Sequence, residues 1–403
     1  MTRPRRSHLF MPGSNPRALE KARNLAADGL ILDLEDSVAP DAKSAARDGI
    51  AAAGGLAMEF PVHPIQETGK RPTAALDRNL AYLGLVEILF GYPLDGVVLT
   101  TGCDKTTPAC MMAAATVNLP AIVLSGGPML NGWHEGQRTG SGTVVWKARE
   151  RLAAGEIDYE QFIEIVASSA PSVGHCNTMG TASTMNSLAE ALGFSLPGCA
   201  AIPAPYRERG QIAYETGKRI VDMVWEDLTP RKIQPRAAFE NAIVVAMAMG
   251  CSTNAIIHLI AQARRAGQNI SLDDFEAFSR KVPVIANVRP SGDKYLMEDF
   301  YYAGGLPGLM SRIRDHLHLD AMTVTGRTLG DNIARAEVHN DDVIRTIANP
   351  IYAEGALAVL KGNLAPDGCV IKPSACEPRF LRHTGPALVF DDYPSMKKAI
   401  DDP

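Results

Sequence analysis

The chain has 403 residues, of which 46% are hydrophobic and 21% charged, a composition typical of a globular protein with two domains or one large one. Its formal net charge of −5 gives no electrostatic basis for nucleic-acid binding. The apolar runs at 95–99 and 120–124 are much shorter than the roughly 20 residues that a membrane-spanning helix needs, so no membrane partner is expected.

The N-terminus and the cysteines indicate the compartment. A basic start is followed by neither a sustained apolar stretch nor a small-residue cleavage site, which argues against a signal peptide. The seven cysteines are an odd number and are scattered without disulfide-like spacing. These features predict a cytoplasmic protein in which individual cysteines act as ligands or nucleophiles.

The first fifty residues read as one βαβ unit. A strand is expected at 9–13, a helix at 16–27 and a second strand, ending in acidic residues, at 29–36. One such unit cannot close a sheet or barrel by itself. The Ala-Gly run that begins at residue 51 reads as a junction, so we expect a fragment at 1–52 and a larger domain at 53–403.

The larger domain alternates short apolar runs, glycine-rich or hydroxyl-rich loops and helical segments. Strands are expected at 95–101, 121–124 and 282–288, and helices at 73–89, 183–192 and 255–266. This alternation predicts an α/β fold whose parallel sheet is covered by helices on both faces, in three layers. Ligands of such folds gather at the carboxyl ends of the strands.

The loop after the strand at 95–101 contains Cys103, Asp104 and Lys105 in succession. A thiolate could bind a soft metal, a carboxylate a hard one, and an amine could be a base or an electrostatic clamp. The alternative is a buried cysteine in a polar turn.

A second loop, at 174–184, contains Cys176 and many hydroxyl side chains and also precedes a helix. Because Cys103 and Cys176 lie far apart in sequence, folding must join them, which fits an iron–sulfur site on strand-end loops better than a local zinc motif. His175 could be a base, although a lone histidine is more often structural. Glu67, in a proline-bounded segment, is a third candidate, with a solvated carboxylate as its alternative.

Four other cysteines have the small neighbours or helical positions of core residues: Cys110, Cys199, Cys251 and Cys369.

From about residue 54 onward the sequence resembles the IlvD/Edd dehydratase family. The strings that carry the resemblance are FPVHPIQET at 60–68, PTAALDRN at 72–79, GCDKTTP at 102–108, GHCNTMGTA at 174–182, STNA at 252–255 and GNLAP at 362–366. The first two are more similar to the pentonate branch, which includes arabinonate and xylonate dehydratases, than to the branched-chain amino-acid enzyme.

The resemblance implies roles for the candidate residues. Cys103 and Cys176 would hold two positions of an iron–sulfur cluster of the 2Fe–2S type. Glu67, Asp104 and a carbamylated Lys105 would coordinate Mg²⁺, because an unmodified Lys105 would be a cation beside the metal. Asp104 and Lys105 would thus take part in catalysis.

The implied protein is a homo-oligomeric hydro-lyase that dehydrates a small-molecule sugar acid to a 2-keto-3-deoxy acid, built on the three-layer N-terminal domain of the family.

Three departures from the family pattern leave alternatives open. No cysteine precedes Cys103, where the family has its first cluster cysteine. Residues 5–48 instead resemble the start of the CitE/HpcH aldolase–lyase family, a (β/α)₈ barrel that binds CoA thioesters and Mg²⁺, through RSHLFMPGS at 6–14 and ADGLILDLED at 27–36. The family's C-terminal β-rich domain, with a further Mg²⁺-ligand glutamate and a serine base, is expected to be absent. The alternatives are therefore a catalytically incomplete fragment or misjoined chain, and a CitE-like C–C lyase.

Overall fold

The computed structural model describes residues 27–33, 40–62 and 74–400. The strand expected at 9–13, nearly all of the helix expected at 16–27 and the candidate ligand Glu67 lie outside these ranges.

Four parallel strands form the main sheet in the order β2–β1–β3–β4. They are β1 (Ala27–Asp33), β2 (Gly55–Pro61), β3 (Val97–Thr101) and β4 (Ala121–Ser125). In the central register Leu30 pairs with Val97, which in turn pairs with Ala121. All residues of β3 and β4 are buried, as expected for a parallel sheet that is covered on both faces.

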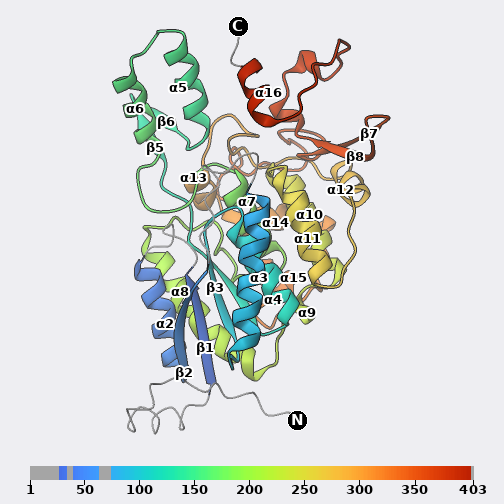
Figure 1. The fold of residues 1–403 in the computed structure, drawn as a ribbon. Helices are drawn as coiled ribbons and strands as arrows, with labels where there is room; N and C mark the ends of the chain where they lie inside the picture. The colour runs from blue at the N-terminus through green and yellow to red at the C-terminus, as the bar shows by residue number, and fades with distance from the viewer. Residues whose placement is uncertain (1–26, 34–39, 63–73, 401–403) are drawn as a thin grey trace.

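Helices cover the two faces of this sheet. On one face lie α2 (Pro40–Ala52) and α8 (Arg207–Trp225), and on the other α3 (Ala75–Gly91) and α4 (Thr106–Val117) (Figure 1). Right-handed crossovers explain the division, because the chain moves outward from β1 to β2 through α2 and then back across the sheet to β3 and β4. The predicted α/β class is therefore confirmed.

The first strand belongs to this same sheet. β1 pairs with β3 as well as with β2, so the predicted junction after residue 52 falls between two strands of one sheet. The division into 1–52 and 53–403 stays a prediction.

Beyond β4 the described chain is mainly helical. Its elements up to residue 333 are β5 (Gly132–His134), β6 (Gln137–Thr139), α5 (Thr143–Ala153), α6 (Tyr159–Ser168), α7 (Thr181–Ala191), α9 (Pro230–Ile233), α10 (Arg236–Met249), α11 (Asn254–Arg265), α12 (Leu272–Ser279), α13 (Met297–Tyr302), α14 (Gly305–Arg312), η1 (Arg314–His316) and α15 (Leu329–Ile333). α10 is apolar around most of its circumference, and this explains why it is buried among α7, α11, α12 and α14.

Three predicted helices are confirmed and one predicted strand is wrong. α3, α7 and α11 begin and end within two residues of the expected positions. Residues 282–288 are buried but form only isolated bridges, such as Val284 with Tyr352 and Ala286 with Ile344. A buried apolar run has the same composition whether its partners are neighbouring strands or separate loop residues. Composition therefore predicted the burial of 282–288 correctly but not its lack of a strand partner.

The last described segment contains an antiparallel hairpin. It comprises β7 (Ala358–Gly362), β8 (Ala365–Ile371), η2 (Pro373–Ala375), η3 (Pro378–Phe380) and α16 (Tyr393–Ile400), near the upper end of the molecule (Figure 1). Cys369 lies in β8 and is exposed, so its predicted place in the core is wrong, whereas Cys110, Cys199 and Cys251 are buried as predicted. The prediction relied on the small residue beside Cys369 in the sequence, but one face of a two-stranded hairpin can be exposed whatever the size of the neighbouring residues.

Two glycines let α2 and α8 approach each other closely. A Cβ atom on Gly49 would lie 2.1 Å from the carbonyl oxygen of Tyr214, and one on Gly217 would lie 2.0 Å from that of Ala46. Real Cβ atoms do not come this close to backbone, so any side chain here must push the helices apart. Gly210, in the same helix α8, has open space around its Cβ position.

Gly217→Ala should therefore lower the free energy of unfolding by about 1–3 kcal/mol, the usual cost of overpacking. Gly210→Ala, the matched control, should raise it by up to about 1 kcal/mol because alanine favours the helix. Urea unfolding followed by circular dichroism measures both changes. Equal stability of the two variants would contradict the close contact.

Candidate active site

The Cys103–Asp104–Lys105 loop connects the end of β3 to the start of α4. Lys105 is completely buried and Asp104 is 8% exposed, while Cys103 is partly exposed. Lys105 Nζ donates to Asp104 Oδ2 at 3.2 Å, and Cys103 Sγ lies 3.4 Å from Asp104 Oδ1. The thiol, carboxylate and amine predicted from the sequence are thus in mutual contact around Asp104.

Hydrogen bonds from α4 hold the backbone of this loop. Thr107 Oγ1 donates to the Cys103 carbonyl at 2.9 Å, and the amide of Ala109 donates to the Lys105 carbonyl at 3.1 Å. The loop is therefore continuous with the first turn of a buried helix, and its three side chains are fixed relative to the sheet.

Asn186 joins this loop to α7. Its amide Nδ2 donates to the carbonyls of Gly102 at 3.3 Å and Ala182 at 2.9 Å, while its Oδ1 accepts from Thr101 Oγ1 at 3.0 Å. Asn186 is fully buried, so each of these bonds replaces one to water. The end of β3 is thereby tied to the helix that follows the Cys176 loop.

The Cys176 loop is paired with the loop after β4. The amide of Met129 donates to the His175 carbonyl at 2.9 Å, and the amide of His175 donates to the Gly127 carbonyl at 3.0 Å. Ser183 Oγ donates to the Cys176 carbonyl at 3.0 Å, while the Cys176 residue itself is exposed. The structure thus brings both predicted cysteine loops to the carboxyl end of the sheet.

His175 has a structural setting. Its Nδ1 is 3.2 Å from the Cys176 carbonyl oxygen. Because a carbonyl oxygen can only accept a hydrogen bond, Nδ1 must carry the proton. Burial, together with the positive charge of Arg209, lowers the pKa of His175 to about 4, so the ring is neutral at pH 7. The buried Nε2 has no hydrogen-bond partner in the described chain, so the structural interpretation of His175 depends on the bond of Nδ1.

The sequence analysis missed two basic side chains near the Cys103 loop, Arg78 in α3 and His258 in α11. Arg78 Nη1 donates to His258 Nδ1 at 3.0 Å, so His258 is neutral with its proton on Nε2. Burial, followed by the positive charges of Lys105 and Arg78, lowers the pKa of His258 to about 2. Nothing in the helical patterns around these two residues distinguishes them, and the one available signal was the string around Arg78 in the family resemblance.

Arg209, also missed, holds the end of β4. Buried in α8, it donates to the Ser125 carbonyl at 2.6 Å and to the Cys199 carbonyl at 2.8 Å. Glu190 of α7 accepts from the amides of Gly198 at 2.7 Å and Ala200 at 2.8 Å, and burial raises its pKa to about 7. These contacts fix the segment around 198–202 under the carboxyl end of the sheet.

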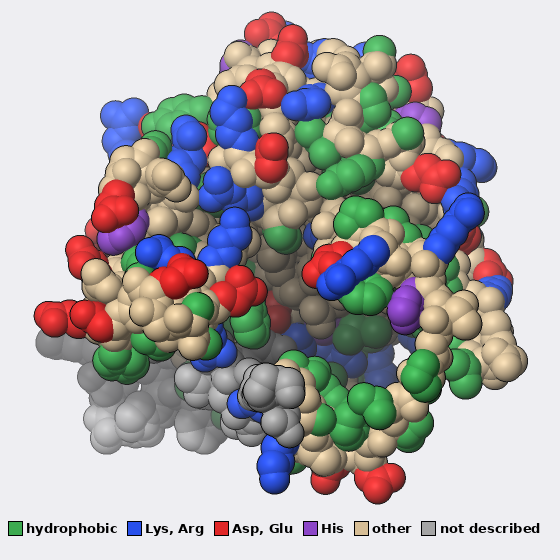
Figure 2. All heavy atoms as spheres, turned by 90° about the horizontal axis from the view of Figure 1, so that it is seen from above, with side chains coloured by type: hydrophobic (Ala, Val, Ile, Leu, Met, Phe, Trp, Pro, Cys, Tyr) green, Lys and Arg blue, Asp and Glu red, His purple; other side chains and the backbone are tan. Residues whose placement is uncertain are grey.

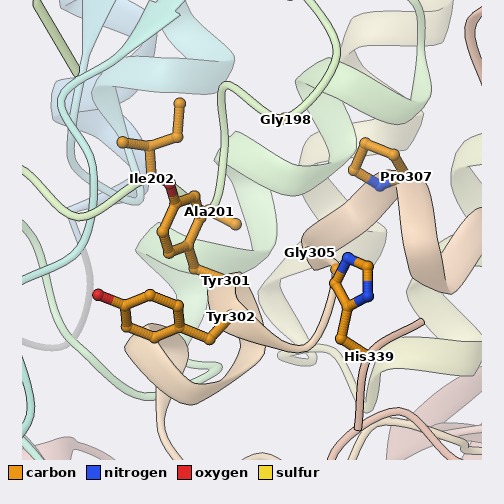
Figure 3. Close-up of a pocket in the computed structure, with 9 residues that line it drawn as sticks. Gly198, Ala201, Ile202, Tyr301, Tyr302, Gly305, Pro307 and His339 are labelled. Atoms are coloured by element: carbon orange, nitrogen blue, oxygen red, sulfur yellow. The ribbon is translucent and has the colours of Figure 1, made fainter. Parts of the chain in front are cut away.

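The carboxyl ends of β3 and β4 point toward the end of the molecule where β5, β6 and α5 lie (Figure 1), and the surface seen from that end is hollowed near its middle (Figure 2). A separate cavity of about 320 Å³ is lined by Tyr301, Tyr302 and His339 together with Gly305 at the start of α14 (Figure 3). The candidate residues Cys103, Asp104, Lys105 and Cys176 do not line that cavity.

The described part of the chain gathers only part of a metal site. It contains no group of three or more His, Cys, Asp or Glu side chains placed to hold a metal ion. Glu67 lies outside the described ranges. The donor chemistry at the strand ends, two thiols and a carboxylate beside a buried lysine, nevertheless matches the ligand classes for iron–sulfur and Mg²⁺.

Asn186→Ala should lower the free energy of unfolding by roughly 1–3 kcal/mol, because it leaves buried groups on Thr101 and Gly102 without partners. The control Asn349→Ala replaces an exposed asparagine and should change stability by less than about 0.5 kcal/mol. Chemical denaturation compares the two variants, and equal stability would contradict the role given to Asn186.

Two models of one known protein family match most of the chain. The model described as dihydroxy-acid/6-phosphogluconate dehydratase N-terminal matches residues 37–332, and its C-terminal counterpart matches 342–403. The expectation that the C-terminal domain is absent is therefore wrong, since the matched segment at 342–403 includes β7 and β8. The model described as HpcH/HpaI aldolase/citrate lyase matches residues 6–63, in agreement with the resemblance at 5–48.

Curated relatives have closely similar sequences. D-xylonate dehydratase of Caulobacter vibrioides is 56% identical over 370 residues, 89% of this chain and 62% of that protein. L-arabinonate dehydratase of Rhizobium leguminosarum bv. trifolii is 51% identical over 356 residues, 88% of this chain and 61% of that protein. Dihydroxy-acid dehydratase of Caldanaerobacter subterraneus is 43% identical over 363 residues, 88% of this chain and 65% of that protein.

The chain thus spans about three-fifths of the length of these relatives. In the described ranges no helix is both long and apolar enough to cross a membrane. Both cysteine loops, the strands β2, β3 and β4 and most of the chain's length lie within the matched regions, and the chain belongs to the IlvD/Edd family of dihydroxy-acid and 6-phosphogluconate dehydratases.

Proposed function

We propose that the chain is a hydro-lyase that dehydrates a pentonate-like sugar acid to a 2-keto-3-deoxy acid with an iron–sulfur cluster and Mg²⁺. The observation that carries the proposal is the contact of Cys103 and Lys105 with Asp104 at the carboxyl end of β3. Similarity to the xylonate and arabinonate dehydratases supports the substrate class.

Cys103 and Cys176 would hold the cluster, which we expect to be of the 2Fe–2S type. Asp104, Glu67 and Lys105 would hold Mg²⁺, with Lys105 as its carbamate. Bound together, the two groups would supply Lewis acidity toward the departing hydroxyl and toward the substrate carboxylate. The thiols suit the softer metal and the carboxylates the harder one.

Charge balance supports carbamylation of Lys105. The unmodified amine is completely buried and forms an ion pair with Asp104. A carbamate would turn this attraction into repulsion between two anions, which a divalent cation between them would offset. Lys105 modification and Mg²⁺ binding are therefore expected to depend on each other.

The protein's contribution to the reaction is positioning and charge. Asn186 and Thr107 keep the Cys103 loop rigid, so the reacting groups need little reorganisation. Arg78 supplies positive charge beside the neutral His258, which favours an anionic substrate nearby. Loss of the C2 proton and of the 3-hydroxyl as water yields an enol that ketonises to the 2-keto-3-deoxy acid.

Cys103→Ser and Cys176→Ser should each lose most of the iron and sulfide that the wild-type chain retains after anaerobic reconstitution, because each removes a cluster thiolate. Cys369→Ser, which alters another exposed cysteine, should keep its iron. Iron and sulfide analysis with visible absorbance measures the result. Full iron in Cys103→Ser would refute the assignment of the cluster.

Asp104→Asn should lower kcat/KM for D-xylonate or L-arabinonate by about 100-fold or more in the reconstituted chain with Mg²⁺, because it removes a metal ligand. Asp367→Asn, at an exposed carboxylate in β8, should leave activity unchanged. Formation of the 2-keto-3-deoxy product is the readout. A chain that is loaded with cluster and Mg²⁺ but converts no pentonate would overturn the proposed function.

A further inference from the structure

The imidazole of His258 has one nitrogen with a hydrogen bond and one without. Arg78 Nη1 donates to Nδ1 at 3.0 Å, so the proton of the neutral ring is on Nε2. His258 is completely buried, and its Nε2 has no hydrogen-bond partner in the described chain. Native proteins rarely leave a buried donor without an acceptor, because the lost bonds to water are not replaced.

Arg78 fixes the orientation of this ring. Asn79 Oδ1 accepts from Arg78 Nε at 3.2 Å and from Nη2 at 2.9 Å, which holds the guanidinium while Nη1 reaches His258. The two nitrogens of an imidazole lie on different edges of the ring. Nε2 therefore faces away from Arg78, and its proton can reach only a group on another side of the ring.

Lys105 is the charged neighbour that acts most strongly on His258. It precedes α4, which packs against α11, the helix of His258. After burial, two positive charges lower the pKa of His258, and that of Lys105 has a larger effect than that of Arg78, although Arg78 is in contact with the ring. The Lys105 side chain is also completely buried. The amine and the Nε2–H donor thus belong to one buried region beside α4 and α11.

These two groups cannot bond to each other while Lys105 is an ammonium, because both are donors. Carbamylation changes this. The neutral amine forms an N–C bond to CO₂, one electron pair of a C=O bond moves onto its oxygen, and one amine proton leaves to solvent. The resulting anion has two acceptor oxygens, and a buried anion needs donors around it.

Gln262, one turn further along α11, does not provide the missing acceptor. It is completely buried, and neither its Oε1 nor its Nε2 has a partner in the described chain. Gln262 and His258 are therefore not bonded to each other, although they follow one another at helical spacing.

We propose that His258 positions Lys105 by donating from Nε2 to one oxygen of the Lys105 carbamate. The inference rests on the carbamylation of Lys105 that the proposed function includes. A neutral donor stabilises one oxygen of the carbamate and leaves the other to Mg²⁺. Partners of metal ligands commonly act in this way, by fixing the orientation of the ligand.

Carbon-13 NMR of the full chain with Mg²⁺ and ¹³C-labelled bicarbonate tests this role, before iron is added so that the signal of the carbamate carbon stays sharp. His258→Asn keeps an acceptor for Arg78 near the position of Nδ1 but removes the Nε2 donor. It should raise the bicarbonate concentration for half-maximal carbamylation by ~10-fold or more. His258→Gln, which places an amide N–H near the position of Nε2, should restore most of the signal.

Gln262→Leu is the matched control, because it alters another completely buried polar side chain of α11. It should keep the wild-type carbamate, and circular dichroism should show all three variants folded. Wild-type carbamylation in His258→Asn, or an equal loss in Gln262→Leu, would overturn the inference.

Two further outcomes separate this inference from the proposed function. A wild-type chain that gives no carbamate signal would refute both the role of His258 and the proposed Mg²⁺ ligand. A chain whose carbamate depends on His258 but that converts no pentonate after reconstitution would support the inference and refute only the proposed reaction.

Discussion

The arrangement of the candidate site depends on the buried amide of Asn186. This side chain bonds to the end of β3 and to the backbone of its own helix α7, and α7 begins directly after the Cys176 loop. The Cys176 loop is held separately to the loop after β4 by backbone bonds of His175 with Gly127 and Met129. Because a buried amide is costly unless all its groups are paired, Asn186 permits one relative position of β3 and α7.

Two basic side chains, Lys105 and Arg78, lie close to the neutral His258 near this part of the site. Lys105 is paired with Asp104, Arg78 donates to His258, and burial keeps His258 neutral. The Lys105–Asp104 ion pair is neutral, and the proposed carbamylation of Lys105 would reverse the charge of that side chain. Structure and proposed chemistry are linked at this point, because the same buried amine that stabilises the free loop would become a ligand once Mg²⁺ is present.

The sequence predicted what depends on local order and missed what depends on distant partners. An apolar run that ends in Gly102 and Cys103 sufficed to place a strand-end loop, and α3, α7 and α11 were evident from their periodicity and their terminating glycines. Asn186 was missed because a buried asparagine in a helix has no sequence signature. The predicted strand at 282–288 and the predicted burial of Cys369 were both wrong. Strand pairing and burial depend on which distant segments pack against a residue, and the local sequence does not show this.

The central claim is that the Cys103 and Cys176 loops form one metal-binding site at the carboxyl end of the sheet. An anomalous difference map at the iron edge, from crystals of the anaerobically reconstituted chain, tests this most directly. The account predicts iron density that adjoins the Sγ atoms of both Cys103 and Cys176. Iron bound to only one of these thiols, or bound elsewhere, would contradict it.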